Sequence, residues 1–276
     1  MNASIRWESF WFKQVPAYRL ALFRAAIAIT TIIFVIPRLN VAVQNYLASS
    51  FHIPMLSWLP TFPACTAQTF KLAEYAAAAC LLIGFFPRLA AGFLAVSGLY
   101  VFLLDAQHYS HWGQFHLIIL ILLTCSKNNL SLIPLFRKDS NSPSTCEVWP
   151  EHLIRLQLSI VLLYTALDKV FSPYWGTSGS FFNYEFGYLR SVATISFASS
   201  PLAWLRAQGY SAILAFPALS SITTIGVEFF LAVSFLFRPL WRIAVPLGFL
   251  FAILLQVFIS PISFAWEFMA ILILFL

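Results

Sequence analysis

The chain has 276 residues, of which 61% are hydrophobic and only 9% are charged, and its mean hydropathy is +0.83. About a quarter of the residues in a soluble globular domain are charged, so this composition excludes that class and indicates an integral membrane protein. The formal net charge of +6 does not indicate nucleic-acid binding, because lysines and arginines gather in the cytoplasmic loops of membrane proteins.

The first apolar stretch follows an aromatic and basic N-terminal segment. Residues 1–18 have the composition of a helix that lies in the membrane interface. The apolar run over 20–36 is too long for the hydrophobic part of a cleavable signal, and no small-residue cleavage pattern follows it. We therefore predict a first membrane-spanning helix over 19–36, ended by Pro37.

Seven further apolar segments follow, each close to the roughly 20 residues that cross a bilayer core. Between them, residues 51–63 alternate prolines with aromatics, which is typical of an ordered hairpin on one membrane face. Residues 136–150 form a hydrophilic loop between the two halves, and 172–218 is rich in aromatic residues. The predicted fold class is all-α: a polytopic membrane protein with a single domain over 1–276 and an aromatic-rich cap outside the cytoplasm. The eight predicted spans are 19–36, 67–86, 89–104, 113–134, 152–170, 219–236, 241–259 and 262–276.

The distribution of the 16 lysines and arginines predicts the orientation. When the spans are threaded in order, most of these cations fall on the side of the N-terminus, and cytoplasmic loops carry such an excess. We therefore expect a multi-pass protein of the bacterial inner (plasma) membrane with both termini in the cytoplasm. On this topology 51–63 and 172–218 share the outer face with Lys169. Irregular chain at membrane depth packs into protein or lines a cavity, so we expect a cap over a pocket.

Lys169 stands where the apolar run of the fifth predicted span ends, directly after Asp168 and shortly before Trp175. An amine that is desolvated among apolar neighbours gives up its proton more easily, which would make Lys169 a usable base. The alternative is a lysine that anchors the helix at the interface beside Trp175. A direct pair with Asp168 does not follow from their adjacency, because neighbouring residues on a helix do not face each other.

Three polar residues in the connection before the fourth span are spaced three apart, namely Asp105, His108 and His111. One helical face could present all three, so a metal site, a hydrogen-bonding role and a contact to substrate are open interpretations. No distant ligand can be named for a metal, and we predict no metal site.

One histidine and three acids also lie inside predicted spans. His116 is expected to make a hydrogen bond between helices. Glu74, Glu228 and Glu267 are intramembrane acids, which either have a functional role or pair with Arg24 or another polar neighbour.

Six fragments follow one another along most of the chain: RLALFR (19–24), FHIPMLSWLP (51–60), IGFFPRLA (83–90), LLDAQHYSHWGQFHLIILILL (103–123), LQLSIVLLYTALDKVFSPYWG (156–176) and VEFFLAVSFLFRPLWR (227–242). In their order and spacing they resemble the family of horizontally transferred transmembrane domain proteins. The vitamin K-dependent gamma-carboxylase is the best-known member of that family.

The resemblance implies roles for particular residues. Lys169 matches the lysine that deprotonates reduced vitamin K in the carboxylase, His111 matches a histidine close to that lysine, and Glu228 matches an acid at the start of a span. The chain departs from the carboxylase at Asp168, where the carboxylase has a second lysine, and at Ser110, where it has an asparagine. The predicted catalytic residues are Lys169 and His111, and the predicted substrate-binding residues are Asp105, His108, Tyr109, Asp168, Trp175 and Glu228.

Two functions follow from the resemblance. The first is an enzyme with a lysine base, acting on reduced vitamin K, another quinol or another lipid-soluble substrate. The large lumenal region of the carboxylase has no match here, which argues against carboxylation of protein glutamates. The alternative is a non-catalytic partner in the maturation of an exported antimicrobial peptide, as in the sporulation-delaying-protein toxin system. Transport is a third hypothesis, but neither inverted repeats nor paired broken helices are evident. The expected partners are therefore the lipid bilayer and either a lipid-soluble substrate or a small exported peptide, without nucleic acid.

Overall fold

The computed structural model describes residues 10–48, 52–56, 58–60, 63–105, 110–126, 145–172, 175, 209–211, 213–258 and 263–275. The chain divides into two compact units. The first unit contains Met1–Ile154 and Trp266–Leu276, and the second unit contains Arg155–Ala265. Each unit is described by itself.

The described elements are helices apart from two three-residue strands. Four helical segments in this part of the chain are long and apolar enough to cross a membrane: Ala17–Ala48, Pro87–Leu104, Pro217–Ser234 and Arg238–Val257. Side chains such as Leu89, Val96 and Phe171 are 72%, 69% and 81% exposed, as expected for helices that present apolar faces to lipid tails. The predicted class, an all-α integral membrane protein, is confirmed, while the count of eight spans and the single domain over 1–276 stay predictions.

The first helical run does not end at Pro37, so that prediction was wrong. Helix α2 (Ala17–Thr30) continues through a π-helical segment η1 (Thr31–Val35) into α3 (Ile36–Ala48). Pro37 is the second residue of α3 but lies inside this continuous run, where a proline removes one backbone hydrogen bond. The wider π turn just before it accommodates the change of hydrogen-bonding pattern.

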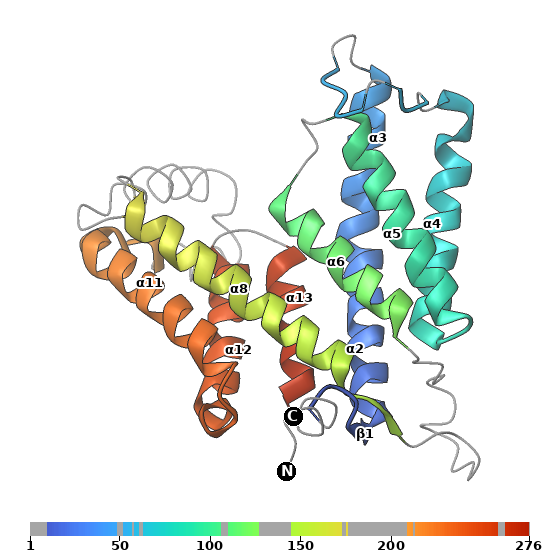
Figure 1. The fold of residues 1–276 in the computed structure, drawn as a ribbon. Helices are drawn as coiled ribbons and strands as arrows, with labels where there is room; N and C mark the ends of the chain where they lie inside the picture. The colour runs from blue at the N-terminus through green and yellow to red at the C-terminus, as the bar shows by residue number, and fades with distance from the viewer. Residues whose placement is uncertain are drawn as a thin grey trace, which may run out of the picture. The chain divides into compact units, whose positions relative to one another are not determined.

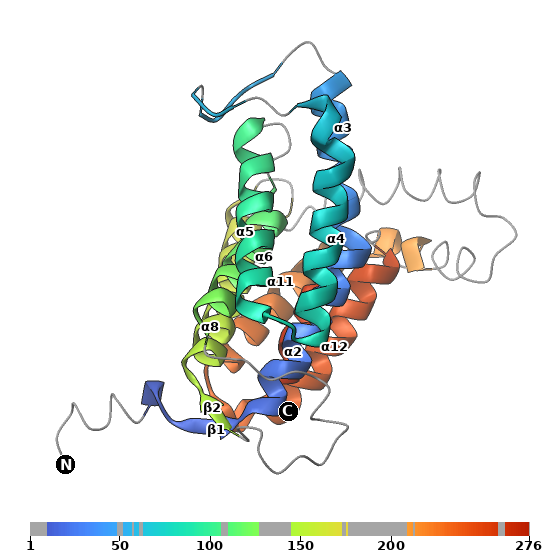
Figure 2. The same ribbon diagram turned by 90° about the vertical axis from the view of Figure 1, so that its right-hand side faces the viewer.

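Residues 14–16 of the predicted interfacial helix form a strand instead, while residues 1–9 lie outside the described residues. Strand β1 (Gln14–Pro16) pairs antiparallel with β2 (Thr145–Glu147), with Gln14 opposite Glu147. Pro16 has φ −58° and ψ 122°, and a proline also disfavours helical backbone in the residue before it. The strand pair lies at the end of the first unit where α2 begins, opposite the end that carries residues 52–60 (Figure 2). The N-terminal segment and the end of the predicted hydrophilic loop therefore lie on the same side of this unit.

Three helices complete most of the first unit: α4 (Ala67–Ile83), α5 (Pro87–Leu104) and α6 (His111–Cys125) (Figure 1). The turn between α4 and α5 uses Gly84 at φ 81°, the left-handed conformation that glycine adopts without strain at a helix C-terminus. Helices α5 and α6 can approach closely at Gly113 because glycine has no side chain. A Cβ added there would lie 2.1 Å from Phe102 Cζ. The last helix, α13 (Ser263–Leu272), continues into η5 (Ile273–Phe275).

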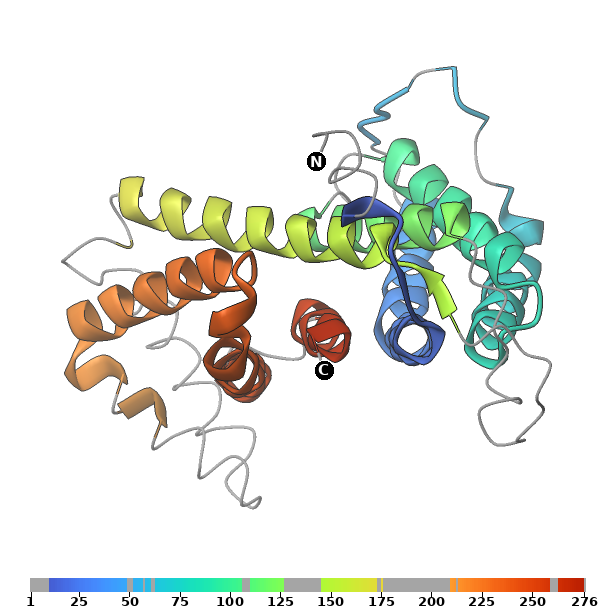
Figure 3. The same cartoon turned by 60° about the horizontal axis from the view of Figure 1, so that its bottom comes forward.

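The second unit contains the greater part of α8 (Trp149–Phe171) together with α11 (Pro217–Ser234) and α12 (Trp241–Phe258). Helix α11 runs alongside the C-terminal half of α8 (Figures 1 and 3). Near the other end of this part of α8, the Arg155 guanidinium lies 4.6 Å from the centroid of the Trp241 ring on α12, a cation–π contact. The contact between Arg155 and Trp241 therefore joins α8 to α12. An ion pair between Lys169 and Glu228 joins α8 to α11.

Candidate functional site

The charged pair of the second unit consists of Lys169 near the end of α8 and Glu228 on α11. The Lys169 Nζ lies 2.6 Å from Glu228 Oε1 and 2.5 Å from Oε2, and the two side chains are 14% and 8% exposed. Charges removed from water destabilise a protein unless they are paired and hydrogen-bonded. The contact with both carboxylate oxygens meets that condition.

An aromatic ring covers the same amine. The Lys169 Nζ lies 4.8 Å from the centroid of the Trp175 ring, within the range of a cation–π contact. The backbone of Trp175 is fixed in turn, because its N–H donates to Ser172 O at 3.3 Å and its carbonyl accepts from Ser221 Oγ. Ser221 stands seven residues before Glu228 on α11 and therefore lies on the same face of that helix. One face of α11 thus holds the Trp175 backbone through Ser221 and the Lys169 amine through Glu228.

Sequence reasoning missed Ser221 in this site. The available signal was the seven-residue spacing between Ser221 and Glu228, but a serine at such a spacing is common in apolar helices and names no partner. Thr165, one turn before Lys169, also lies next to the Glu228 carboxylate. The Lys169 amine therefore contacts Glu228 and the Trp175 ring, and Thr165 is a further polar neighbour of the carboxylate.

The structure does not bring Asp168 into this group. Its side chain is exposed, and the described contact of this residue is its carbonyl, which accepts from Ser172 N at 2.9 Å. Adjacent residues point away from each other on a helix, so Lys169 turns to Glu228 instead. Lys169, Glu228 and Trp175 come together, and their catalytic or substrate-binding roles stay predictions.

Asp105 follows α5 in the first unit and is 2% exposed. Its Oδ2 lies 3.4 Å from His52 Nδ1, and its Oδ1 accepts from the Ile53 N–H at 3.4 Å. The His52 ring packs on Tyr46, with the centroids 4.1 Å apart. Asp105 therefore anchors the segment that follows α3, a contact that the sequence did not reveal, and its role in substrate binding stays a prediction.

The histidines of the predicted site are described only in part. His111 is the first residue of α6 in the first unit, where Ser110 caps the helix by accepting from Gly113 N at 3.1 Å. The side chain of His111 lies outside the described residues, as do His108 and Tyr109. Within the part of the chain that the structure describes, no group of three or more potential metal ligands comes together.

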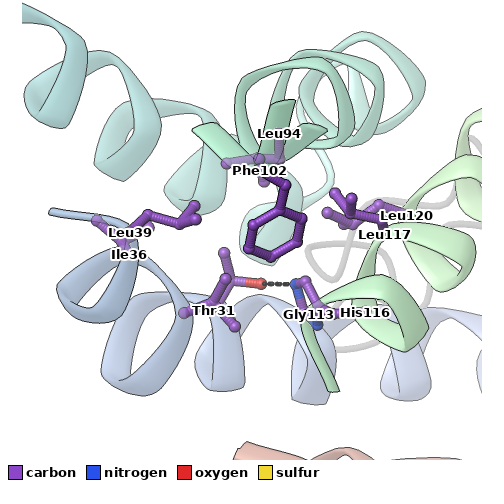
Figure 4. A pocket seen from close by; sticks show the side chains of 11 residues that line it. Thr31, Ile36, Leu39, Leu94, Phe102, Gly113, His116, Leu117 and Leu120 are labelled. Atoms are coloured by element: carbon purple, nitrogen blue, oxygen red, sulfur yellow. Dashed lines mark hydrogen bonds between the residues drawn. The ribbon is translucent and has the colours of Figure 1, made fainter. Parts of the chain in front are cut away.

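A second polar cluster lies in the core of the first unit. The His116 Nε2 lies 3.1 Å from Thr31 Oγ1, so the predicted hydrogen bond between helices is confirmed (Figure 4). The other ring nitrogen, Nδ1, lies 3.1 Å from Glu267 Oε1 on α13. Arg24 is 1% exposed, and its guanidinium has no hydrogen-bond partner among the described residues. Glu267 therefore pairs with His116 and not with Arg24.

The apolar helices and the buried charged pairs define an integral membrane protein, and comparison with known proteins gives its family. The HTTM domain matches residues 12–276, so the chain belongs to the HTTM family, as the resemblance predicted. Comparison with curated proteins and with solved structures gave no significant match. The closer likeness to the gamma-carboxylase or to the peptide-maturation protein stays a prediction.

Proposed function

We propose that this protein is an enzyme of the inner (plasma) membrane, multi-pass and with both termini in the cytoplasm, that uses Lys169 as a base. Its substrate is a lipid-soluble molecule with an acidic hydroxyl group, of the hydroquinone type. The observation that carries the proposal is the arrangement of Lys169, Glu228 and Trp175, in which one amine contacts both a carboxylate and an aromatic face.

The carboxylate gives the amine a way to become a base. A proton of the Lys169 ammonium can move to Glu228 over 2.5–2.6 Å, which leaves a neutral amine beside a carboxylic acid. In surroundings of low dielectric constant a neutral pair needs less solvation than two separated charges. The neutral Nζ then accepts a proton from a substrate hydroxyl, and Glu228 keeps the first proton within the site.

The aromatic ring gives the site a preference for a flat substrate. Trp175 presents its ring to the amine, and a hydroquinone ring stacks favourably on an aromatic neighbour. Stacking there would bring the substrate hydroxyl towards Lys169. The resemblance adds support, because Lys169 matches the lysine base of the gamma-carboxylase and His111 matches its neighbouring histidine.

The test supplies a reduced naphthoquinone under air to purified protein in lipid vesicles and follows the quinone epoxide by mass spectrometry. Hydroquinone and dioxygen give epoxide and water, so one oxygen atom enters the product and the other leaves as water. Loss of a positioned base lowers rates by about 100- to 10,000-fold, and we expect a fall of that order in Lys169→Ala. The matched control is Lys71→Ala, at a half-buried lysine on α4, which should keep the wild-type rate.

Wild-type epoxide formation that persists in folded Lys169→Ala would overturn the proposal. A folded wild-type protein that forms no epoxide would favour the role as partner in peptide maturation. The aromatic stretch 172–218 on which that alternative depends lies for the most part outside the described residues.

A further inference from the structure

The turn between α4 and α5 exposes two aromatic rings at one end of the first unit. Phe85 and Phe86 are 58% and 63% exposed, and their ring centroids lie 4.5 Å apart in an edge-to-face arrangement. Figure 1 shows this turn at the end of the unit where α2 begins. The Lys169 site belongs to the second unit, so an inference from this turn is independent of the proposed function.

The backbone of Phe86 is strained. Its φ is 43° and its ψ is 51°, the left-handed conformation that bulky residues rarely adopt because Cβ then lies too close to the backbone. Glycine takes this conformation without strain, as Gly84 does two residues earlier. Strain of this kind gathers at ligand-binding sites. A mostly exposed ring adds little to the core, so the use of phenylalanine here favours a role on the surface.

A hollow of about 320 Å³ lies at this turn. Its lining consists of three apolar residues and one cation, namely Phe86, Pro87, Leu89 and Arg88. Sites for small ligands have volumes of about 300 to 1,000 Å³. The hollow is therefore large enough for part of a ligand that has both an apolar and an anionic portion.

The Arg88 side chain is held in place by the end of α6. Its Nε donates to the carbonyl oxygen of Thr124 at 3.1 Å, one of the last carbonyls of the helix, which have no partner within it. This bond uses only one of the N–H donors of the guanidinium. No carboxylate in the described part of the chain forms an ion pair with Arg88. The exposed guanidinium can therefore bind a phosphate through a pair of N–H donors.

An exposed apolar stripe leads from the hollow along α5. Leu89, Phe93 and Val96 are spaced four and three residues apart and so lie on one face of the helix, and all three are exposed. With a rise of 1.5 Å per residue the stripe covers about 10 Å. Helix α5 is long and apolar enough to cross a membrane. Leu89 belongs both to the hollow and to the stripe, which makes the two surfaces continuous.

We propose that the hollow at the α4–α5 turn, with the stripe on α5, is a binding site for an anionic phospholipid. Arg88 binds the lipid phosphate, Phe86 and Leu89 contact the glycerol and the first methylene groups, and one acyl chain follows the stripe. The positive guanidinium is complementary to an anionic headgroup, and the stripe fits an acyl chain. A free phosphate would leave the stripe unused, so the ligand is a lipid.

The test is native mass spectrometry of the detergent-solubilised protein titrated with dioleoylphosphatidylglycerol. We expect Arg88→Gln to raise the lipid concentration that half fills the tightest site by about tenfold or more, because a hydrogen bond between charged groups is lost. The matched control is Arg38→Gln, which removes the same charge at another exposed arginine of the first unit, on α3. This control should bind the lipid as the wild type does.

Phe86→Gly is the second variant, because it removes the ring and relieves the strain together. We expect it to unfold at the wild-type temperature or above and to bind dioleoylphosphatidylglycerol more weakly. Unchanged lipid binding in folded Arg88→Gln or in Phe86→Gly would overturn the proposal. Equally tight binding of dioleoylphosphatidylcholine would overturn it too, since that lipid has no net charge. Release of the bound lipid by excess inorganic phosphate would show a phosphate site and would also contradict the proposal.

Discussion

The two units each contain a basic side chain beside a carboxylate, and the two pairs differ in what surrounds them. Lys169 is 14% exposed, carries a flexible side chain and lies next to a single aromatic ring near the end of its helix. His116 is 1% exposed, has a rigid ring and is held on two sides by Thr31 and Glu267. The first pair is partly exposed, whereas the second is enclosed in the core of its unit. The two sites therefore differ mainly in how deeply the basic side chain is buried and in how rigidly it is held.

The largest expected effect comes from breaking the Lys169–Glu228 pair. Removing one partner of a buried ion pair costs about 3 to 5 kcal/mol, because the other charge remains buried without compensation. We therefore expect Glu228→Leu to lower the unfolding temperature of the detergent-solubilised protein strongly. The double variant Lys169→Met/Glu228→Leu should recover most of this loss. A double variant as unstable as the single one would show that the two residues do not stabilise the fold as a pair.

A smaller effect on stability is expected when a glycine in each unit is replaced by alanine. In Gly113→Ala the new Cβ would lie 2.1 Å from Phe102 Cζ, and overpacking of this kind costs about 1 to 3 kcal/mol. Gly226 on α11 has no atom within 4 Å of such a Cβ among the described residues. Alanine also favours the helix by up to about 1 kcal/mol over glycine, so Gly226→Ala should be neutral or stabilising. Thermal unfolding of both variants checks the contrast, and equal destabilisation would contradict it.

The smallest expected effect concerns the ring beside Lys169. A contact between two aromatic rings contributes about 0.5 to 1.5 kcal/mol beyond the area that it buries, and Trp175→Phe keeps a smaller aromatic face for the substrate. We expect Trp175→Phe to reduce substrate affinity by about tenfold or less, and Trp175→Ala to reduce it further. The apparent KM for the hydroquinone in the epoxide assay measures both effects. A lower KM in Trp175→Ala would show that the ring obstructs the substrate and does not support it.

The membrane class and the helices that form the two sites could be predicted from the sequence. Apolar runs of bilayer length predict where helices lie. Polar residues inside such runs, among them Glu228 and Glu267, are predicted to pair or to have a function, because an isolated charge in a membrane is energetically costly. Fragment order also led to the family, and through it to Lys169 as a candidate base.

The pairings inside each unit could not be predicted, because they depend on contacts between residues far apart in the chain. Glu267 turns to His116, which is 151 residues away in the numbering, rather than to Arg24. The strand pairing of 14–16 with 145–147 likewise leaves no periodic signal in segments of three residues. Pro37 misled the prediction, since the π turn that accommodates it has no sequence pattern of its own.

The most direct test of the proposed function is the epoxide assay on membranes that carry the wild-type protein, Lys169→Ala or Lys71→Ala in equal amounts. The proposed function predicts epoxide from the wild type and from Lys71→Ala, and a rate at least about 100-fold lower from Lys169→Ala. Equal rates from the folded Lys169 and Lys71 variants would contradict it, and Lys169 would then be a charge that joins α8 to α11.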